Sequence, residues 1–139
     1  MTATLGRYGK TFEGAKPIVF SRRITFPNGK VIFAEVAIEP EDLVRGLMFR
    51  ERLEPDEGML FVHPNSGSFP IHMRNTLMPL DVVWISSGGR IVEMARGLQP
   101  CKSDDCPSFG GRVPSAFTLE LAAGTIARNG LKPGDIVTW

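Results

Sequence analysis

Residues 69–85 read FPIHMRNTLMPLDVVWI, and this stretch decides the fold. Its last six residues are largely apolar, which is typical of a buried strand. Pro79 disfavours helix for the residue before it, so a bend is expected ahead of that strand. The same stretch holds His72, Arg74, Asn75 and Asp81, and such groups are costly to bury without partners. We therefore expect a functional site within this segment or beside it.

Outward from this stretch, the chain predicts short strands joined by turns and loops. Strands are expected at residues 17–20, 24–26, 31–38, 59–62, 71–73, 80–85, 90–95, 117–121 and 136–139, with a loop at 63–68. A helix is expected from Pro40, since proline fits a first helical turn, and a helical turn is expected at 125–128. This order of elements predicts a mainly β fold, a compact antiparallel β-sandwich or small barrel with one or two short helices.

Length and charge limit the classes of protein to consider. The chain has 139 residues, of which 42% are hydrophobic, and a net charge of +1. We expect residues 1–22 to form an N-terminal arm with a first short strand, and residues 23–139 to form a single domain. The balanced charge argues against a nucleic-acid binder, and no apolar run reaches the roughly 20 residues of a membrane span. The N-terminus as written lacks the apolar core of a signal peptide. The protein is therefore either cytoplasmic, or exported after removal of a longer leader.

Several motifs follow one another in a recognisable order. They are RGLMFR at 45–50, GMLF at 58–61, MRNTLMPLD at 73–81, CPSF at 106–109, LE and AG at 119–124, and KPGD at 132–135. By these motifs the chain resembles the DUF192 family of small bacterial and archaeal proteins of unknown function. That family usually has a Phe-Trp pair before its Met-Lys/Arg-Asn-Thr, where this chain has Ile71 and His72. The resemblance implies a compact, mostly β fold and frequent export, and it implies no established activity.

The polar residues of the central stretch are the first candidates for binding. An arginine can hold a carboxylate or phosphate in two-point geometry, and an amide can orient a carbonyl or hydroxyl. We expect a small anionic or carboxylate-bearing ligand in a groove between this stretch and the helix from Pro40. The predicted ligand-binding residues are Arg74, Asn75, Asp81, Arg50 and Met48. The alternative is structural: Asp81 and Asn75 bind backbone N–H groups and hold the bend at Pro79.

Two classes of function remain open. The first is a non-catalytic module of the cell envelope that binds a small ligand or peptide. The second is a hydrolase or lyase that uses Asp81 or Glu35 as a base and Arg74 to stabilise an anion; Asp81 and His72 are its weak catalytic candidates. The sequence contains no nucleophile elbow, phosphate loop, dinucleotide fingerprint or zincin motif, so we favour binding and expect no cofactor.

The two cysteines, Cys101 and Cys106, lie in a long loop predicted at residues 97–113. A zinc site would need a second pair of ligands at matching spacing, and the sequence has none, so no metal is expected. A disulfide between the two cysteines is expected if the protein is exported, and free thiols if it is cytoplasmic.

Overall fold

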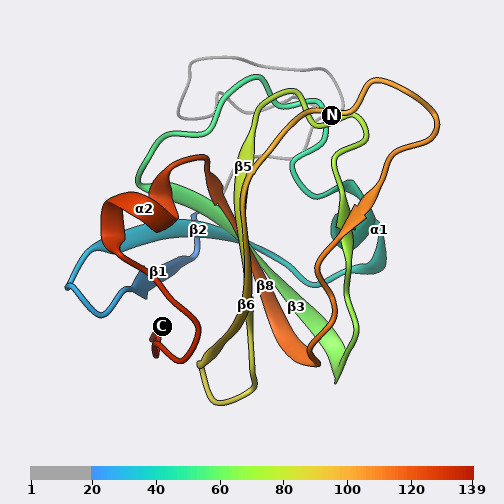
Figure 1. Cartoon of the computed structure of the whole chain (residues 1–139). Helices are drawn as coiled ribbons and strands as arrows, with labels where there is room; N and C mark the ends of the chain where they lie inside the picture. Colours follow the sequence, from blue (N-terminus) through green and yellow to red (C-terminus); the bar gives the residue numbers. More distant parts are fainter. Residues whose placement is uncertain (1–19) are drawn as a thin grey trace.

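A computed structural model describes residues 20–139, and its centre is a six-stranded mixed sheet of order β1-β2-β3-β8-β5-β6 (Figure 1). The strands of this sheet are β1 (Arg22–Thr25), β2 (Val31–Ala37), β3 (Glu57–Gly67), β8 (Ser115–Ala122), β5 (Leu80–Ile85) and β6 (Ile91–Leu98). A small second sheet pairs β4 (Ile71–His72) with β7 (Ser108–Phe109), and the helices are α1 (Pro40–Arg45) and α2 (Thr125–Asn129). The predicted mainly β class with short helices is confirmed, and the strands described close no barrel.

The two helices cover opposite faces of the large sheet, as Figure 1 shows. β2 and β3 pair in parallel, in contrast to the antiparallel pairs elsewhere in the sheet. Parallel neighbours cannot be joined by a tight turn, so the chain needs a crossover between them. α1 lies in that crossover and is thereby placed over one face. None of the helices described is long and apolar enough to cross a membrane.

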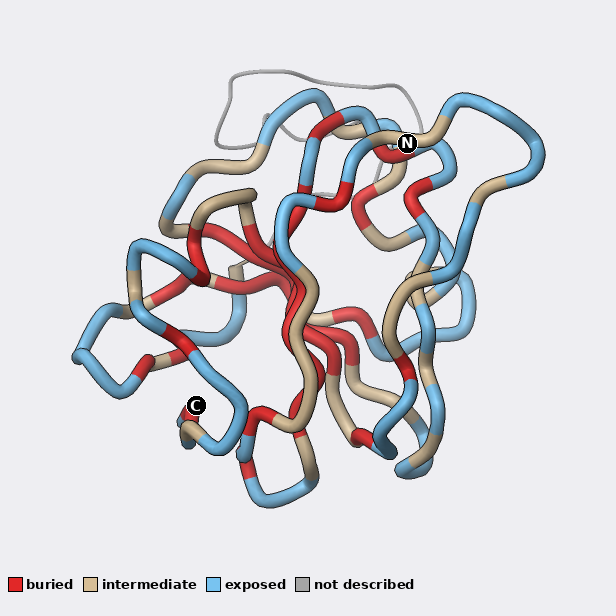
Figure 2. Tube along the Cα trace, in the orientation of Figure 1, coloured by how far each residue is buried: buried red, intermediate tan, exposed pale blue. Residues whose placement is uncertain are grey.

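Alternation along the strands divides the buried side chains between two cores, one under each helix. The core on the α2 side includes Leu60, Leu119, Leu121 and Ile126. The core on the α1 side includes Leu47, Met59, Phe61, Val82 and Trp84. Figure 2 shows buried residues concentrated along the central strands, where the two cores meet back to back.

Trp84 fixes the segment before β4 against the large sheet. Its side chain is fully buried, and its indole N–H donates a hydrogen bond to the carbonyl of Phe69 at 2.8 Å. Gly110 lies so close that a Cβ there would be 2.2 Å from the indole ring. The segment that carries β4 therefore packs directly over the α1 face of the sheet, beside α1.

The elements predicted at residues 136–139 and 63–68 differ from the structure. Residues 136–139 form no strand; they make isolated bridges from Ile136 to Arg90 and from Thr138 to Thr25. Most of the loop predicted at 63–68 instead continues β3 to Gly67, with an irregular register between Val62 and Gly67. The strand predicted at 17–20 lies, apart from Phe20, outside the residues described, and so does nearly all of the predicted N-terminal arm.

Candidate functional site

A cavity of about 420 Å³ lies between α1, the segment before and through β4, and the floor formed by β3 and β8. We call it the α1 cavity. Its walls are mainly apolar, and its polar groups are few. The residues that line it are Leu43, Val44, Arg45, Gly46, Leu47, Met48, Phe61, His63, Pro64, Ser68, Phe69, Pro70, Ile71, His72, Thr76, Thr118 and Glu120. A groove was predicted between the helix from Pro40 and residues 69–85, and the cavity lies at that place.

The floor of the cavity results from strand alternation in β8. Thr118 pairs with Phe61 and Glu120 pairs with Met59 across the antiparallel β3–β8 ladder. Side chains two residues apart on a strand point to the same face. Thr118 and Glu120 therefore face α1, whereas Leu119 between them packs into the core under α2.

Glu120 is the most unusual residue of the floor. The residue is 8% exposed, and its carboxyl group forms no hydrogen bond or ion pair with residues 20–139. Burial raises the pKa of this carboxyl group from 4.5 to about 7, because desolvation penalises the charged form. The cavity thus has at its floor a carboxyl group that is about half ionised at neutral pH.

Gly46 brings the end of α1 close to this floor. It follows the helix at φ +48°, a backbone conformation that glycine adopts readily. A Cβ at this position would lie 3.0 Å from the Phe61 ring and 3.7 Å from Oε1 of Glu120. A side chain at residue 46 would therefore press on Phe61 and partly fill the space beside Glu120.

His63 and Thr118 form a hydrogen-bonded pair on the same floor. The Nε2 atom of His63 is 2.7 Å from the hydroxyl oxygen of Thr118. The imidazole ring stacks on Phe69, with ring centroids 3.6 Å apart and planes inclined by 6°. Burial lowers the pKa of His63 below 6.5, so the ring is neutral at pH 7. The pair supplies a neutral imidazole and a hydroxyl group beside the carboxyl group of Glu120.

The predicted binding residues lie in several different places. Met48 lines the α1 cavity. Arg50 instead holds Glu35 through both guanidinium nitrogens, with 2.9 Å between Nη2 and Oε1. Arg74 is half exposed and pairs with exposed Asp104, at 3.2 Å between Nη2 and Oδ1. Neither arginine lines the cavity, so their predicted contact with a ligand stays a prediction.

Asn75 and Asp81 make backbone contacts away from the cavity. Asn75 has φ +58°, and its carbonyl accepts a hydrogen bond from the N–H of Phe49 at 2.8 Å. Asp81 is 1% exposed, and its carboxylate accepts hydrogen bonds from three backbone N–H groups, those of Gly97, Gly124 and Ile126. Asp81 thus ties β6 and the start of α2 to β5, and it lies outside the cavity lining.

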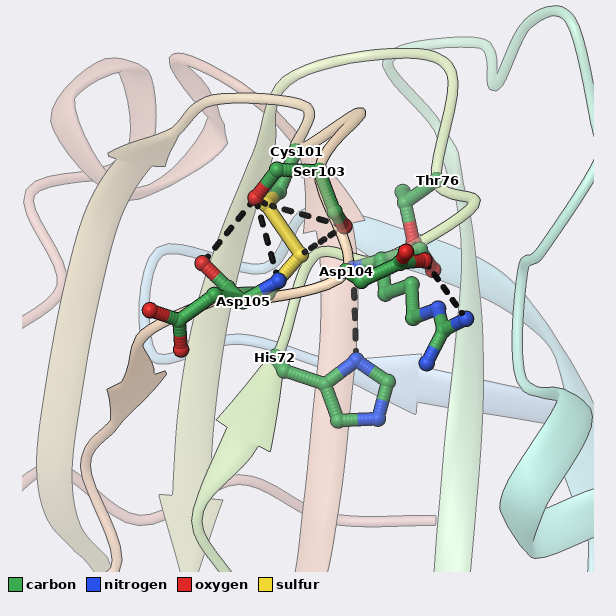
Figure 3. Close-up of a disulfide and its surroundings, with 8 residues drawn as sticks. His72, Thr76, Cys101, Ser103, Asp104 and Asp105 are labelled. Carbon is green, nitrogen blue, oxygen red and sulfur yellow. Dashed lines mark hydrogen bonds and ion pairs between the residues drawn. A yellow bond between two sulfur atoms is a disulfide. The ribbon is translucent and has the colours of Figure 1, made fainter.

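His72 lies close to the disulfide loop, as Figure 3 shows. It is exposed and lines the cavity mouth, and its Nδ1 accepts a hydrogen bond from the backbone N–H of Arg74 at 3.2 Å. The backbone N–H of Cys101 in turn donates to the carbonyl of Met73 at 3.1 Å. A disulfide joins Cys101 to Cys106, which confirms the predicted pairing. Within the part of the chain described, no three His, Cys, Asp or Glu residues are grouped to hold a metal ion.

The disulfide gives a direct test of this loop. Unreduced protein unfolded in denaturant is expected to show no reactive thiol, because both cysteines of the chain are bonded. Replacing both cysteines by serine should lower the free energy of unfolding by about 2 kcal/mol, since the closed loop is short. Thiol titration and urea unfolding measure the two quantities. Two reactive thiols before reduction would contradict the pairing.

Sequence reasoning missed three residues of the floor: His63, Thr118 and Glu120. The available signal was the alternation of residues 117–121, which places Thr118 and Glu120 on one face of a strand. Such alternation is typical of a half-buried strand whose polar face is solvated. This face is buried because α1 and the segment before β4 cover it. The local sequence pattern of residues 117–121 does not show that either segment crosses the strand.

Comparison with known proteins gives a family but no activity. The family model of DUF192, described as an uncharacterised family, matches residues 23–139. A crystal structure of a protein of unknown function from Novosphingobium aromaticivorans has 33% identity and a TM-score of 0.76, and the match covers 84% of this chain and 82% of that one. A Sinorhizobium meliloti protein described as "a putative transcription regulator" has 35% identity and a TM-score of 0.73, and the match covers 84% and 89% of the two chains. Among curated proteins, none matches significantly.

Proposed function

We propose that this chain, which belongs to the DUF192 family, binds a small organic ligand in the α1 cavity without transforming it. The observation that carries the proposal is Glu120, whose buried carboxyl group faces the cavity and has no polar partner among residues 20–139. Buried polar side chains nearly always have partners, and an exception calls for an explanation. The simplest explanation is that a polar group of the ligand pairs with the carboxyl group of Glu120.

The composition of the walls supports a small, partly apolar ligand. Phe61, Phe69, Leu43 and Ile71 supply apolar surface. On the floor, His63, Thr118 and Glu120 supply polar groups. Binding sites for small molecules commonly combine apolar walls with a few polar groups that fix orientation. The volume of about 420 Å³ falls within the range of such sites.

The catalytic alternative depended on residues that already have other partners. Asp81 accepts three backbone hydrogen bonds, Glu35 is paired with Arg50, and Arg74 is paired with Asp104. A base and an anion-stabilising group must reach the same substrate. None of Asp81, Glu35 and Arg74 lines the α1 cavity. We therefore favour binding over hydrolase or lyase chemistry.

The cell envelope is part of the same proposal. Disulfides form and persist mainly in oxidising compartments, such as the bacterial periplasm. The Cys101–Cys106 bond supports such a location. Fractionation of cells that produce the protein from its native gene tests this part separately from ligand binding.

Binding in the α1 cavity is tested with benzyl alcohol as a neutral probe and methyl NMR of the protein. We expect shifts for the methyl groups of Leu43, Ile71 and Thr118, which line the cavity. The methyl groups of Leu119 and Ile126 should not shift, because they lie in the core on the other face. Shifts confined to the second set, or none at all, would contradict the proposal.

A pair of variants controls this experiment. Val44 lines the cavity mouth and is 74% exposed, so Val44→Trp adds a bulky ring there with little effect on the core. Ile38 is 57% exposed and lies outside the lining, so Ile38→Trp adds the same ring elsewhere. We expect Val44→Trp to weaken probe binding severalfold and Ile38→Trp to leave it unchanged.

A further inference from the structure

We propose that the ligand of the α1 cavity carries a protonated amine that pairs with the carboxylate of Glu120. This inference rests on the proposed function and adds the chemical class of the ligand. It is drawn from the contrast between two buried carboxylates in one row of the sheet, from the charges around Glu120, and from the aromatic walls.

The contrast is between Glu35 and Glu120. Both lie opposite Met59, Glu35 on β2 and Glu120 on β8, and both residues are 8% exposed. Glu35 is held by both guanidinium nitrogens of Arg50. Glu120 has no such partner among the residues described. The fold therefore neutralises one buried carboxylate with its own arginine and leaves the other facing a cavity.

The charged and titratable groups around Glu120 come from four elements. On β2, Glu35 is already paired with Arg50. On β3, the buried imidazole of His63 is neutral near pH 7 and bonded to a hydroxyl group. Beyond them, Arg45 of α1 and His72 of β4 are exposed lining residues, and neither forms an ion pair with Glu120. Within the described part of the chain, no cation forms an ion pair with the Glu120 carboxylate.

The aromatic walls favour a cation over an anion. Phe61 and Phe69 line the cavity, and a Cβ at Gly46 would touch the Phe61 ring while lying 3.7 Å from Glu120. An ammonium group gains both from a buried carboxylate and from the negative face of an aromatic ring. A carboxylate ligand would face a like charge unless Glu120 were protonated. The anion expected from the sequence depended on Arg74 and Arg50, which are engaged elsewhere.

The inference predicts a pH dependence with a defined sign. Burial raises the pKa of the Glu120 carboxyl to about 7, so the group is mostly protonated below that pH. An amine must displace this proton in order to pair with the carboxylate. Affinity for an amine should therefore fall about tenfold for each pH unit below 7 and level off above it. Affinity for a carboxylate should change in the opposite direction.

Three probes of the same shape test the inference: benzylamine, benzyl alcohol and benzoate. They place a cation, a neutral group and an anion on one ring. Dissociation constants are measured by methyl NMR at about pH 8 and about pH 5.5. At the higher pH we expect benzylamine to bind at least tenfold more tightly than benzyl alcohol, and this advantage should be lost at the lower pH.

The matched variant is Glu120→Gln, which keeps the size of the side chain and removes its charge. It should retain binding of benzyl alcohol and lose the preference for benzylamine. If the variant does not fold, the pH dependence of the wild-type protein decides by itself. Benzylamine that binds no better than benzyl alcohol at pH 8, or benzoate that binds most tightly, would overturn the inference and leave the proposed function standing. Failure of all three probes to shift the cavity methyl groups would contradict both.

Discussion

Replacing Asp81 by alanine is expected to lower the free energy of unfolding by about 3–5 kcal/mol. The carboxylate of Asp81 accepts hydrogen bonds from the backbone N–H groups of Gly97, Gly124 and Ile126 at 2.9–3.0 Å. Alanine removes the acceptor and leaves three N–H donors without it; the hydrogen bond of Ile126 is buried, and those of Gly97 and Gly124 are partly buried. A donor left unsatisfied costs about 1–3 kcal/mol where water is excluded. Urea unfolding followed by circular dichroism measures the loss.

Two controls make this result specific. Asp81→Asn keeps one acceptor oxygen, so an intermediate loss is expected. Asp104 is also an aspartate with a partner, Arg74, but that ion pair is on the surface, so Asp104→Ala should move the urea midpoint very little. An unchanged midpoint in Asp81→Ala would show that the three hydrogen bonds do not hold β6 and α2 to β5.

The free energy of unfolding of Glu120→Gln minus that of wild type is expected to be larger at pH 8 than at pH 4. Burial raises the pKa of Glu120 from 4.5 to about 7 in the folded state. The folded protein therefore binds this proton more tightly than the unfolded chain does. The stability due to the protonated carboxyl is fully present below pH 4.5 and is lost as the pH rises through 7. Glutamine does not titrate, so the difference between the two proteins should grow by roughly 3 kcal/mol over this range.

Urea unfolding of both proteins at several pH values between 4 and 8 measures this difference. All other titrating groups are common to the two chains, so their contributions cancel to first order. A difference that stays constant from pH 4 to pH 8 would mean that Glu120 is solvated or paired in the folded state. Such a result would remove the main support for a ligand site at this residue.

The sequence predicts those elements whose local pattern and final environment agree. Residues 80–85 form a nearly continuous apolar run, and β5 spans these residues with every side chain buried. The helix begins at Pro40 as predicted, because proline and the acidic residues beside it suit a first helical turn. In both places the determining interactions lie within a few residues of one another.

Local patterns fail where a distant segment determines the conformation. His63 to Gly67 contain residues typical of a turn, yet β3 continues through them. Thr118 of β8 contributes to this continuation of β3, because its hydroxyl group forms a hydrogen bond with the His63 ring. At the C-terminus, Ile136 and Thr138 face single partners in Arg90 and Thr25, so bridges form where a strand was predicted.

The candidate site illustrates the same limit. Arg74 and Asn75 are predicted to bind a ligand because their polar side chains interrupt an apolar segment. Arg74 lies on the surface beside the disulfide loop, and Asn75 uses a positive φ at a turn. The sequence pattern does not single out Glu120, because a charged residue in an alternating strand normally faces water. Glu120 is buried because the β2–β3 crossover carries α1 across that face and the segment before β4 covers it as well.

The most direct test of the central claim is a pH titration of the Glu120 side-chain carboxyl carbon by ¹³C NMR, with and without saturating benzylamine. We predict a pKa of about 7 in the free protein, and a clear decrease when the amine is bound, because the ammonium group stabilises the carboxylate. A pKa near 4.5 that benzylamine does not change would show that Glu120 is an ordinary solvated carboxylate, and it would contradict a cation site in the α1 cavity.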